Sequence, residues 1–523
     1  MNTAFKRELQ VERCHQVKSW DFIIIGGGAT GLGVALDASS RGFSTLLLEQ
    51  SDFAKGTSSR STKLIHGGVR YLAQGSLKLV YRALRERGIL LNNAKHLVSK
   101  QSFIIPCFTR WNRIKYFSGL KIYDWIAGRS SLGRSTLLSK NDVHRILPLI
   151  NSNNLRGGIG YFDCRFDDAR LAINLAQTSA EYGATICNYM QVTGLLRNNE
   201  KICGVTAVDL ETGDRLNLQG TAVINATGVF VDDVLQMDIP GSKPTVKPSQ
   251  GVHLVTDKRF LQSNTAVMIP ETSDGRVLFA LPWKDHVLIG TTDTPVEKKS
   301  IEPKALQSEI DFILSTLRQY WTDPPSEKDV LSVFAGLRPL AAPKNSTGKT
   351  KEISRDHKLI VAGSGLITIT GGKWTTYRNM AEITVNKAIK VHHLKHADCE
   401  TKNIKIHGFT NVVSKSHLNV YGSDEEKIKE LINDDPALGN KLCEQLPYTL
   451  AEVIWAVRYE MARTVEDVLA RRIRILFFDS KAALKSAPIV ADLIAKELNY
   501  DEEWKRKQLD DFTILAQDYL LAN

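Results

Sequence analysis

A glycine-rich turn near the N-terminus carries the clearest chemical signal in the sequence. Gly26, Gly28 and Gly31 stand at the first, third and sixth positions of GGGATG, directly after the apolar run DFIII and before a helix-like segment. The first glycine permits a tight turn, the second lets a pyrophosphate approach the backbone, and the third allows a helix to pack closely on a strand. The helix N-terminus adds partial positive charge. This spacing predicts dinucleotide binding, against the alternative of a turn that is merely rich in glycine.

Glu49 and two later glycine turns indicate an extended cofactor. Glu49 ends the next strand-like run, STLLLE, where an acidic side chain commonly binds a ribose hydroxyl. Gly228 follows the strand-like run TAVINAT, and Gly371 and Gly372 follow a third run, with Thr375 just beyond them. Three glycine turns far apart in the chain suit one long ligand that several segments contact. This favours FAD over NAD.

The segment 51–75 is rich in serine, threonine and glycine, and we expect it to be a functional loop. A structureless stretch of about 20 residues inside a compact domain is uncommon unless it binds something. Its hydroxyl and N–H groups suit sugar and phosphate oxygens, and its glycines permit close approach of a flat ring. We predict cofactor contacts from Thr57, Ser58, Ser61, His66, Gly67 and Gly68. The alternative is a solvated linker.

Strand-like and helix-like segments alternate up to about residue 390, and the rest of the chain is helical in pattern. The alternation predicts an α/β fold, with a Rossmann-like FAD-binding domain, an interleaved mixed-sheet substrate domain and a C-terminal all-helical domain. Within the helical part, 451–477 is expected to be one long amphipathic stretch. The expected division is 18–395 for the oxidoreductase region (FAD-binding segments about 18–109, 151–244 and 346–395; substrate segments about 110–150 and 245–345) and 408–523 for the helical domain.

Charge and composition limit the partners. The net charge is +11, and the positive excess lies in the first 400 residues, because residues 401–523 hold more acidic than basic side chains. A basic front part suits an anionic substrate or an anionic membrane surface, and no Lys/Arg run is dense enough for a nucleic-acid arm. Seven scattered cysteines without a CxxC pair indicate a reducing compartment and no structural metal site. Neither a signal peptide nor an apolar membrane span is expected, so any membrane contact should be peripheral.

Several blocks together resemble the FAD-dependent glycerol-3-phosphate dehydrogenases. The first is IGGGATGLGVALD, in which Leu32 stands where that family usually has a small residue. The second, GGKWTTYRNMA from Gly371, matches in full. Between them lie TSSRSTKLIHGGVRYL, PSQGVHLV, LPWKDHVLIGTTDTP, AGLRPL and SRDH, and also INATGVFVDDV, where a Pro-Trp pair often replaces Val229 and Phe230. The resemblance covers roughly residues 20–520.

The resemblance implies oxidation of sn-glycerol 3-phosphate to dihydroxyacetone phosphate. Hydride would pass from C2 to FAD, and electrons would then pass to membrane quinone. A phosphate dianion needs convergent cations, and arginine is the planar, bidentate choice. Within the family-like blocks, the residues expected at the substrate are Arg338, Arg355 and Lys373, with Arg70 and Tyr71 beside the flavin. The alternative for each cation is a surface salt bridge.

Two histidines are candidates for the general base, His66 beside the flavin loop and His253, because a histidine titrates near the operating pH. The apolar neighbours of His253 leave open a buried histidine that only satisfies the core, and a lysine with a depressed pKa could serve instead. Asp293, in GTTDT, is expected to order a turn and not to transfer protons.

The segment 110–134 combines six Lys/Arg with five aromatic residues, a composition typical of membrane-surface segments. The alternative is a basic helix that packs on its own domain. The expected location is cytoplasmic and peripheral on the cytoplasmic membrane. The helical tail shows no catalytic motif, so packing or homodimer formation is its hypothetical role.

The sequence leaves three other functions open. A glycerol-3-phosphate oxidase, with O₂ as acceptor, shares nearly every motif but usually carries an insertion. An amino-acid or sarcosine oxidase should lack GGKWTTYR and the arginine-rich pocket. A non-catalytic flavin-binding module would bind FAD without being reduced by any small alcohol phosphate.

Overall fold

The N-terminal βαβ unit lies at the centre of an eight-stranded sheet. The computed structural model describes residues 5–69, 72, 76–341 and 357–521. Four other strands of this sheet run parallel to β1 (Trp20–Ile25), two of them as its direct neighbours, and the apolar run of β1 is buried because helices cover the sheet. The strand order is β17 (His357–Val361), β18 (Ile367–Gly371), β10 (Arg215–Asn225), β1, β2 (Thr45–Leu48) and β7 (Thr185–Cys187), with β8 (Met190–Asn198) and β9 (Lys201–Asp209) extending β10 as an antiparallel meander.

Three helices pack together against this sheet. The central one is α2 (Ala29–Ser40), which begins at the glycine turn and contacts α7 (Asp168–Glu181) and α10 (Tyr377–Val391). Asp167 caps α7 by accepting a hydrogen bond from the backbone N–H of Arg170. Two further helices flank the unit: α1 (Arg7–Gln16), which contacts β7, and α8 (Val231–Asp238).

A second, ten-stranded mixed sheet carries the remaining strands. Its order is β15 (Thr294–Pro295), β11 (Val246–Asp257), β14 (His286–Gly290), β13 (Leu278–Trp283), β12 (Ala266–Ile269), β4 (Val98–Pro106), β6 (Gly158–Phe166) and β3 (Leu64–Ile65), with β16 (Val330–Ala341) on β11 and β5 (Thr136–Leu138) on β6. Only the β4–β12 pair in this sheet is parallel among the described strands. Strands β3, β4 and β6 come from ranges expected to be FAD-binding segments, so the chain alternates between the sheets more finely than the expected boundaries.

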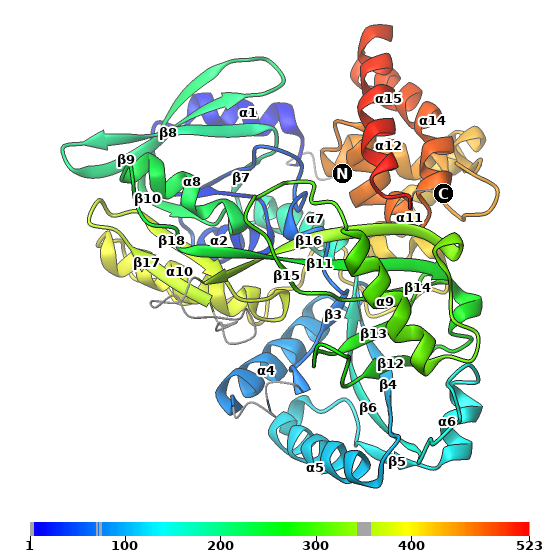
Figure 1. Ribbon diagram of the computed structural model, residues 1–523. Helices are drawn as coiled ribbons and strands as arrows, with labels where there is room; N and C mark the ends of the chain where they lie inside the picture. Colours follow the sequence, from blue (N-terminus) through cyan, green and yellow to red (C-terminus); the bar gives the residue numbers. More distant parts are fainter. Residues whose placement is uncertain (1–4, 70–71, 73–75, 342–356, 522–523) are drawn as a thin grey trace.

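Helices surround the second sheet. They are α4 (Leu77–Asn93), α5 (Arg110–Ala127), α6 (Lys140–Ile146) and α9 (Gln307–Tyr320). Thr109 caps α5 by accepting a hydrogen bond from the N–H of Asn112. As Figure 1 shows, α4 and α5 lie together at the end of the molecule away from the C-terminal helices.

The C-terminal region is helical, but its central segment is not one long helix as expected. The helix α12 (Leu450–Glu460) ends at Met461, whose φ of +55° turns the chain, and a π-helical turn follows at Asp467–Arg472 before α13 (Ile475–Phe478). Buried arginines and acids in this segment pair with other parts of the chain, so the chain departs from a regular amphipathic helix. The other helices are α11 (Glu425–Asp434), α14 (Ser480–Leu498) and α15 (Glu502–Gln517). Figure 1 shows them at one end of β11 and β16.

Candidate active site

One cavity of about 1320 Å³, lined by both sheets, brings together most of the predicted site residues. The predicted residues on its wall are Gly26, Gly28, Glu49, Thr57, Ser58, Ser61, His66, Gly68, Gly228, Gly371, Gly372 and Thr375, together with His253, Arg338 and Lys373. Two predicted glycines, Gly31 and Gly67, do not line it. Three predicted residues, Arg70, Tyr71 and Arg355, lie outside the described part of the chain.

The first glycine turn leaves no room for side chains at two positions. Gly26 has a φ of +108°, and a Cβ atom there would lie 2.9 Å from the carbonyl oxygen of Ala226. A Cβ on Gly31 would lie 1.9 Å from the carbonyl oxygen of Gly26. Gly31 therefore permits close packing of α2 on β1, as the motif predicts. Gly67 is likewise a packing residue, since a Cβ there would lie 2.5 Å from the hydroxyl of Tyr123.

Glu49 connects the end of β2 to the glycine turn. Its carboxylate accepts hydrogen bonds from the N–H groups of Gly27 (2.7 Å) and Ser51 (2.9 Å). Burial raises the pKa of this carboxyl, although both backbone bonds act in the opposite direction. The side chain thus fixes the turn and also presents an acidic group to the cavity.

Side-chain bonds hold the serine- and threonine-rich loop against three other segments, so the loop is not a solvated linker. The hydroxyl of Ser58 accepts from the N–H of Ala29 at 3.0 Å, and its carbonyl accepts from the indole of Trp374 at 2.8 Å. Thr57 donates to the carbonyl of Leu337 on β16 at 2.6 Å. The loop therefore joins the first glycine turn, the last glycine turn and the second sheet around the cavity.

The residues on this wall fit FAD. The N-terminus of α2 is capped by Gly28, which has no side chain to occupy the space that a pyrophosphate needs. Gly228 has a φ of +62°, and a Cβ there would meet nothing within 4 Å, so the wall is open at the second glycine turn too. An acid, several hydroxyl side chains and three glycine turns lie along one continuous cavity, as an extended dinucleotide requires.

Arg338, on β16, lies on the wall of the cavity. Its guanidinium donates to the carbonyl of Gln250 (3.2 Å) and the hydroxyl of Thr291 (3.0 Å), and lies 3.5 Å from the carboxylate of Asp293. One quarter of the side chain is exposed, and it lines the cavity. Arg338 is therefore a fixed cation on the cavity wall and not an exposed surface charge.

A second arginine that the sequence did not single out lies beside it. Arg276 pairs with Asp274 at 3.0 Å, and its guanidinium lies 4.0 Å from Asp293. Asp293 also accepts a hydrogen bond from Ser249. Asp293 therefore organises two cavity-lining arginines, a role different from the expected ordering of a turn.

His253 is both buried and on the cavity wall. Its side chain is 2% exposed, its Nε2 lies 3.0 Å from the hydroxyl of Thr62, and its ring stacks on Phe334 with centroids 5.0 Å apart. Burial, helped by the charges of Lys63 and Arg338, lowers the pKa of His253 well below its usual value. The imidazole is therefore neutral at neutral pH, and the lowered pKa makes it a weaker base than a histidine that titrates near the operating pH.

Lys63, at the end of the loop, has a buried amine, and the sequence did not single it out. Its ammonium donates to the carbonyl of Ser59 (2.7 Å) and the carboxylate of Asp168 (2.6 Å). Burial lowers its pKa to about 7. The only sequence sign of this residue was a basic side chain inside the block SSRSTKLI, and the sequence cannot distinguish a buried lysine from an exposed one.

The sequence of this chain matches two family models and several dehydrogenases of known name. The family model for FAD dependent oxidoreductases matches residues 21–378, and that for the C-terminal domain of alpha-glycerophosphate oxidase matches 366–505. A mitochondrial glycerol-3-phosphate dehydrogenase from Schizosaccharomyces pombe is 37% identical, over 98% of this chain and 89% of its own. That from Rattus norvegicus is 38% identical, over 97% and 74%. The chain belongs to the FAD-dependent glycerol-3-phosphate dehydrogenase family.

Solved structures agree with membership of this dehydrogenase family. The glycerol-3-phosphate dehydrogenase from Bacillus halodurans, complexed with FAD, has a TM-score of 0.81 and 29% identity over 99% of this chain and 98% of that chain. The L-alpha-glycerophosphate oxidase from Mycoplasma pneumoniae, also with FAD bound, has a TM-score of 0.57 and 17% identity over 73% and 97%, so it supports the fold alone. This member of the dehydrogenase family is thus an FAD-dependent oxidoreductase with the expected fold class.

Proposed function

We propose that this protein oxidises sn-glycerol 3-phosphate to dihydroxyacetone phosphate and passes the electrons to membrane quinone. The observation that carries the proposal is the continuity of one cavity from the glycine turn at Gly26 to the fixed guanidinium of Arg338. FAD supplies the hydride acceptor when it is bound in this cavity. The printed names of the relatives supply the alcohol phosphate as substrate.

The proposed substrate contacts are electrostatic. Arg338 offers a planar fork whose orientation its protein partners fix, and Lys373 adds a second cation on the same wall. Arg355, Arg70 and Tyr71 remain predictions for the same site. His253, neutral and held by Thr62, would accept the proton of the C2 hydroxyl.

Anaerobic titration tests the proposal. The purified holoenzyme should lose its visible flavin band on addition of sn-glycerol 3-phosphate and regain it on addition of a quinone analogue. Glycerol is the matched control, since it lacks the phosphate, and should bleach the band only at far higher concentration. Recovery with O₂ alone, with peroxide formed, would assign an oxidase. A band that the substrate does not bleach would refute the dehydrogenase.

We also propose that α5 and the start of α4 contact an anionic membrane surface. Large apolar side chains are exposed on these helices: Leu77, Tyr81, Trp111, Ile114, Ile122 and Trp125. Trp125 is 82% exposed, and basic residues of the same helix stand beside it. The helix also reaches the cavity through Tyr116 and Ile122, so an acceptor in the lipid would meet the cavity here.

Liposome binding tests the membrane contact. Neutralising Arg110, Arg113 and Lys115 together should weaken binding to anionic vesicles, and unchanged binding would remove the proposal. Among the described residues, no helix has the length and apolar character to cross a membrane. We expected the cytoplasmic membrane, whereas several relatives are named mitochondrial, so cell fractionation must identify the membrane. Dimerisation through the helical domain stays a prediction, for light scattering to test.

A further inference from the structure

Three arginines of the C-terminal helical domain are buried beneath the FAD-binding domain. Arg471, Arg472 and Arg474 belong to the π-helical turn and the residues just after it, and each is at most 1% exposed. Burying a guanidinium is costly unless acids or carbonyls surround it. The acids and carbonyls that pair with these arginines therefore show which segment the arginines stabilise. Most of these partners belong to the loop at 51–63 or to residues that contact this loop.

The beginning of the loop is held at Asp52. Arg472 binds both carboxylate oxygens of Asp52, at 2.7 and 2.9 Å, and Arg471 donates to the same carboxylate. The two guanidinium groups hold the pKa of this fully buried carboxyl below its usual value, despite the opposing effect of burial. Asp52 lies three residues after Glu49, so this clamp acts next to the acid that faces the cavity.

The end of the loop is held at Ser59 and Asp168. Arg474 donates to the carbonyl of Ser59 at 3.0 Å and pairs with Asp168 at 3.1 Å. Asp168 in turn accepts from the N–H of Ser61 at 3.1 Å and from Lys63. One arginine thus orders the segment whose hydroxyl groups line the cavity.

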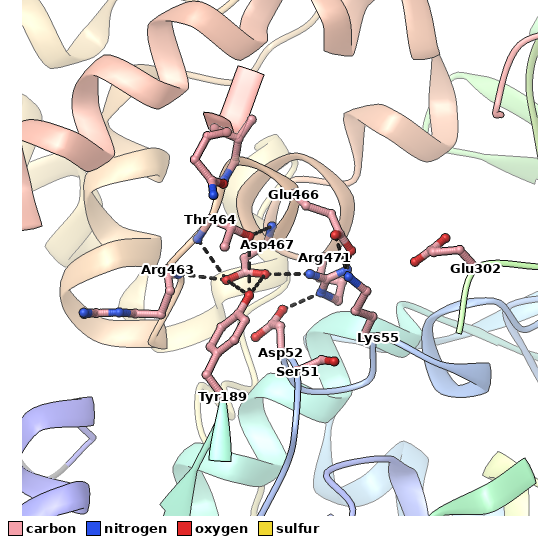
Figure 2. Close-up of polar contacts among 12 residues, drawn as sticks. Ser51, Asp52, Lys55, Tyr189, Glu302, Arg463, Thr464, Glu466, Asp467 and Arg471 are labelled. Carbon is pink, nitrogen blue, oxygen red and sulfur yellow. Dashed lines mark hydrogen bonds and ion pairs between the residues drawn. The ribbon is translucent and has the colours of Figure 1, made fainter. Parts of the chain in front are cut away.

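A partly solvated contact at Glu466 and a buried one at Asp467 complete the clamp, as Figure 2 shows. Glu466 bridges Lys55 of the loop (2.7 Å) and Arg471 (2.5 Å). Asp467 accepts from the hydroxyl of Tyr189 at 2.7 Å, and the N–H of Tyr189 donates to the carbonyl of Ser51 at 3.1 Å. The helical domain therefore contacts both ends of the loop and its middle.

We infer that the C-terminal helical domain contributes to FAD binding. Arg471, Arg472 and Arg474 are positioning residues for the loop at 51–63. Glycine, serine and threonine make this loop adaptable, and a loop that must be ordered on binding lowers affinity. The arginines order it beforehand through Asp52, Ser59 and Asp168. This role goes beyond packing or dimer formation.

The test compares FAD affinity in three variants. Arg472→Gln removes the fork on Asp52, and Glu466→Gln removes a milder contact at a side chain that is 17% exposed. Arg463→Gln is the matched control, because its side chain joins the same two domains through Glu211 (2.8 Å) and does not touch the loop. Figure 2 shows Arg463 pointing away from Asp52.

Each variant is stripped of FAD and titrated with it, and thermal unfolding is followed with and without the cofactor. We expect Arg472→Gln to raise the FAD dissociation constant about 10- to 100-fold, by analogy with the range found when groups that orient metal ligands are removed. Glu466→Gln should raise it about threefold to tenfold. The increase in Tm on FAD binding should shrink in both variants. Arg463→Gln should lower Tm equally with and without FAD and leave the dissociation constant unchanged.

An unchanged dissociation constant in folded Arg472→Gln, or an equal rise in the control, would overturn the inference. If Arg472→Gln does not fold, Glu466→Gln decides on the same criteria. Because the readout is FAD binding, the inference can fail or hold whatever the substrate proves to be.

Discussion

Replacing Arg338 by methionine should weaken binding of the substrate phosphate and leave all other contacts of the substrate unchanged. The guanidinium is oriented by Gln250, Thr291 and Asp293, so it meets a phosphate with little reorganisation. A hydrogen bond to a charged group contributes about 1.5–3 kcal/mol. We take the low end for two bonds, since a quarter of the side chain is exposed, which gives about 3 kcal/mol and about a 150-fold loss in kcat/KM.

The assay uses pairs of ligands that differ only in the phosphate. In Arg338→Met, the inhibition constant of dihydroxyacetone phosphate should rise about as steeply as kcat/KM falls, and that of dihydroxyacetone should stay the same. Arg145→Met, at an exposed pair with Asp142, is the control and should change neither. An equal loss for both ligands would refute the reasoning, because it would show that Arg338 supports the cavity and does not bind the phosphate.

Three further predictions follow from the same geometry. His253→Asn should lower kcat about 10²- to 10⁴-fold and leave the flavin spectrum intact; a normal kcat would exclude His253 as the base. His407 lies between two carboxylates at 2.6 Å, which raise its pKa to about 9, so it should contribute about 3 kcal/mol of stability that is fully present below about pH 6.5 and lost as the pH rises through 9. In urea unfolding, His407→Gln should therefore be less stable than the parent at pH 6 and similar to it above pH 9.5; a constant difference would contradict this. Trp111→Ser and Trp125→Ser should each weaken partition into anionic vesicles by on the order of 2 kcal/mol, about thirtyfold, while a matched change at buried Trp20 would act on folding instead.

The local part of the site follows from the sequence because its geometry is local. The spacing of Gly26, Gly28 and Gly31 sets a turn, a helix start and a close contact within six residues, and the structure has all three. The alternation of elements likewise predicted both sheets and the helical end. The assignment of single strands to one sheet or the other did not follow, because β4 and β6 have no pattern that is specific to either sheet.

Residues that act through distant partners could not be found in this way. Arg276 matters because Asp293 lies between it and Arg338, and no sequence spacing encodes that arrangement. The break after Met461 has the same origin, because the charges of the following segment are neutralised by Asp52 and Asp168, hundreds of residues earlier. The only sequence feature that indicated buried ion pairs in this segment was the presence of arginines within an apolar helical pattern.

The distance along the chain between Asp52 and its arginine partners has a consequence for synthesis. The bond from Arg471 to Asp52 joins residues 419 positions apart, and the last strand of the first sheet, β18, is itself made only at Ile367–Gly371. A ribosome-bound chain that ends before Arg471 has a buried acid without its counter-charge and a loop without its support. Contacts of this sequence separation form late. Loading of the cofactor should therefore be one of the last events in the maturation of the nascent protein, and shortened translation products should be released empty.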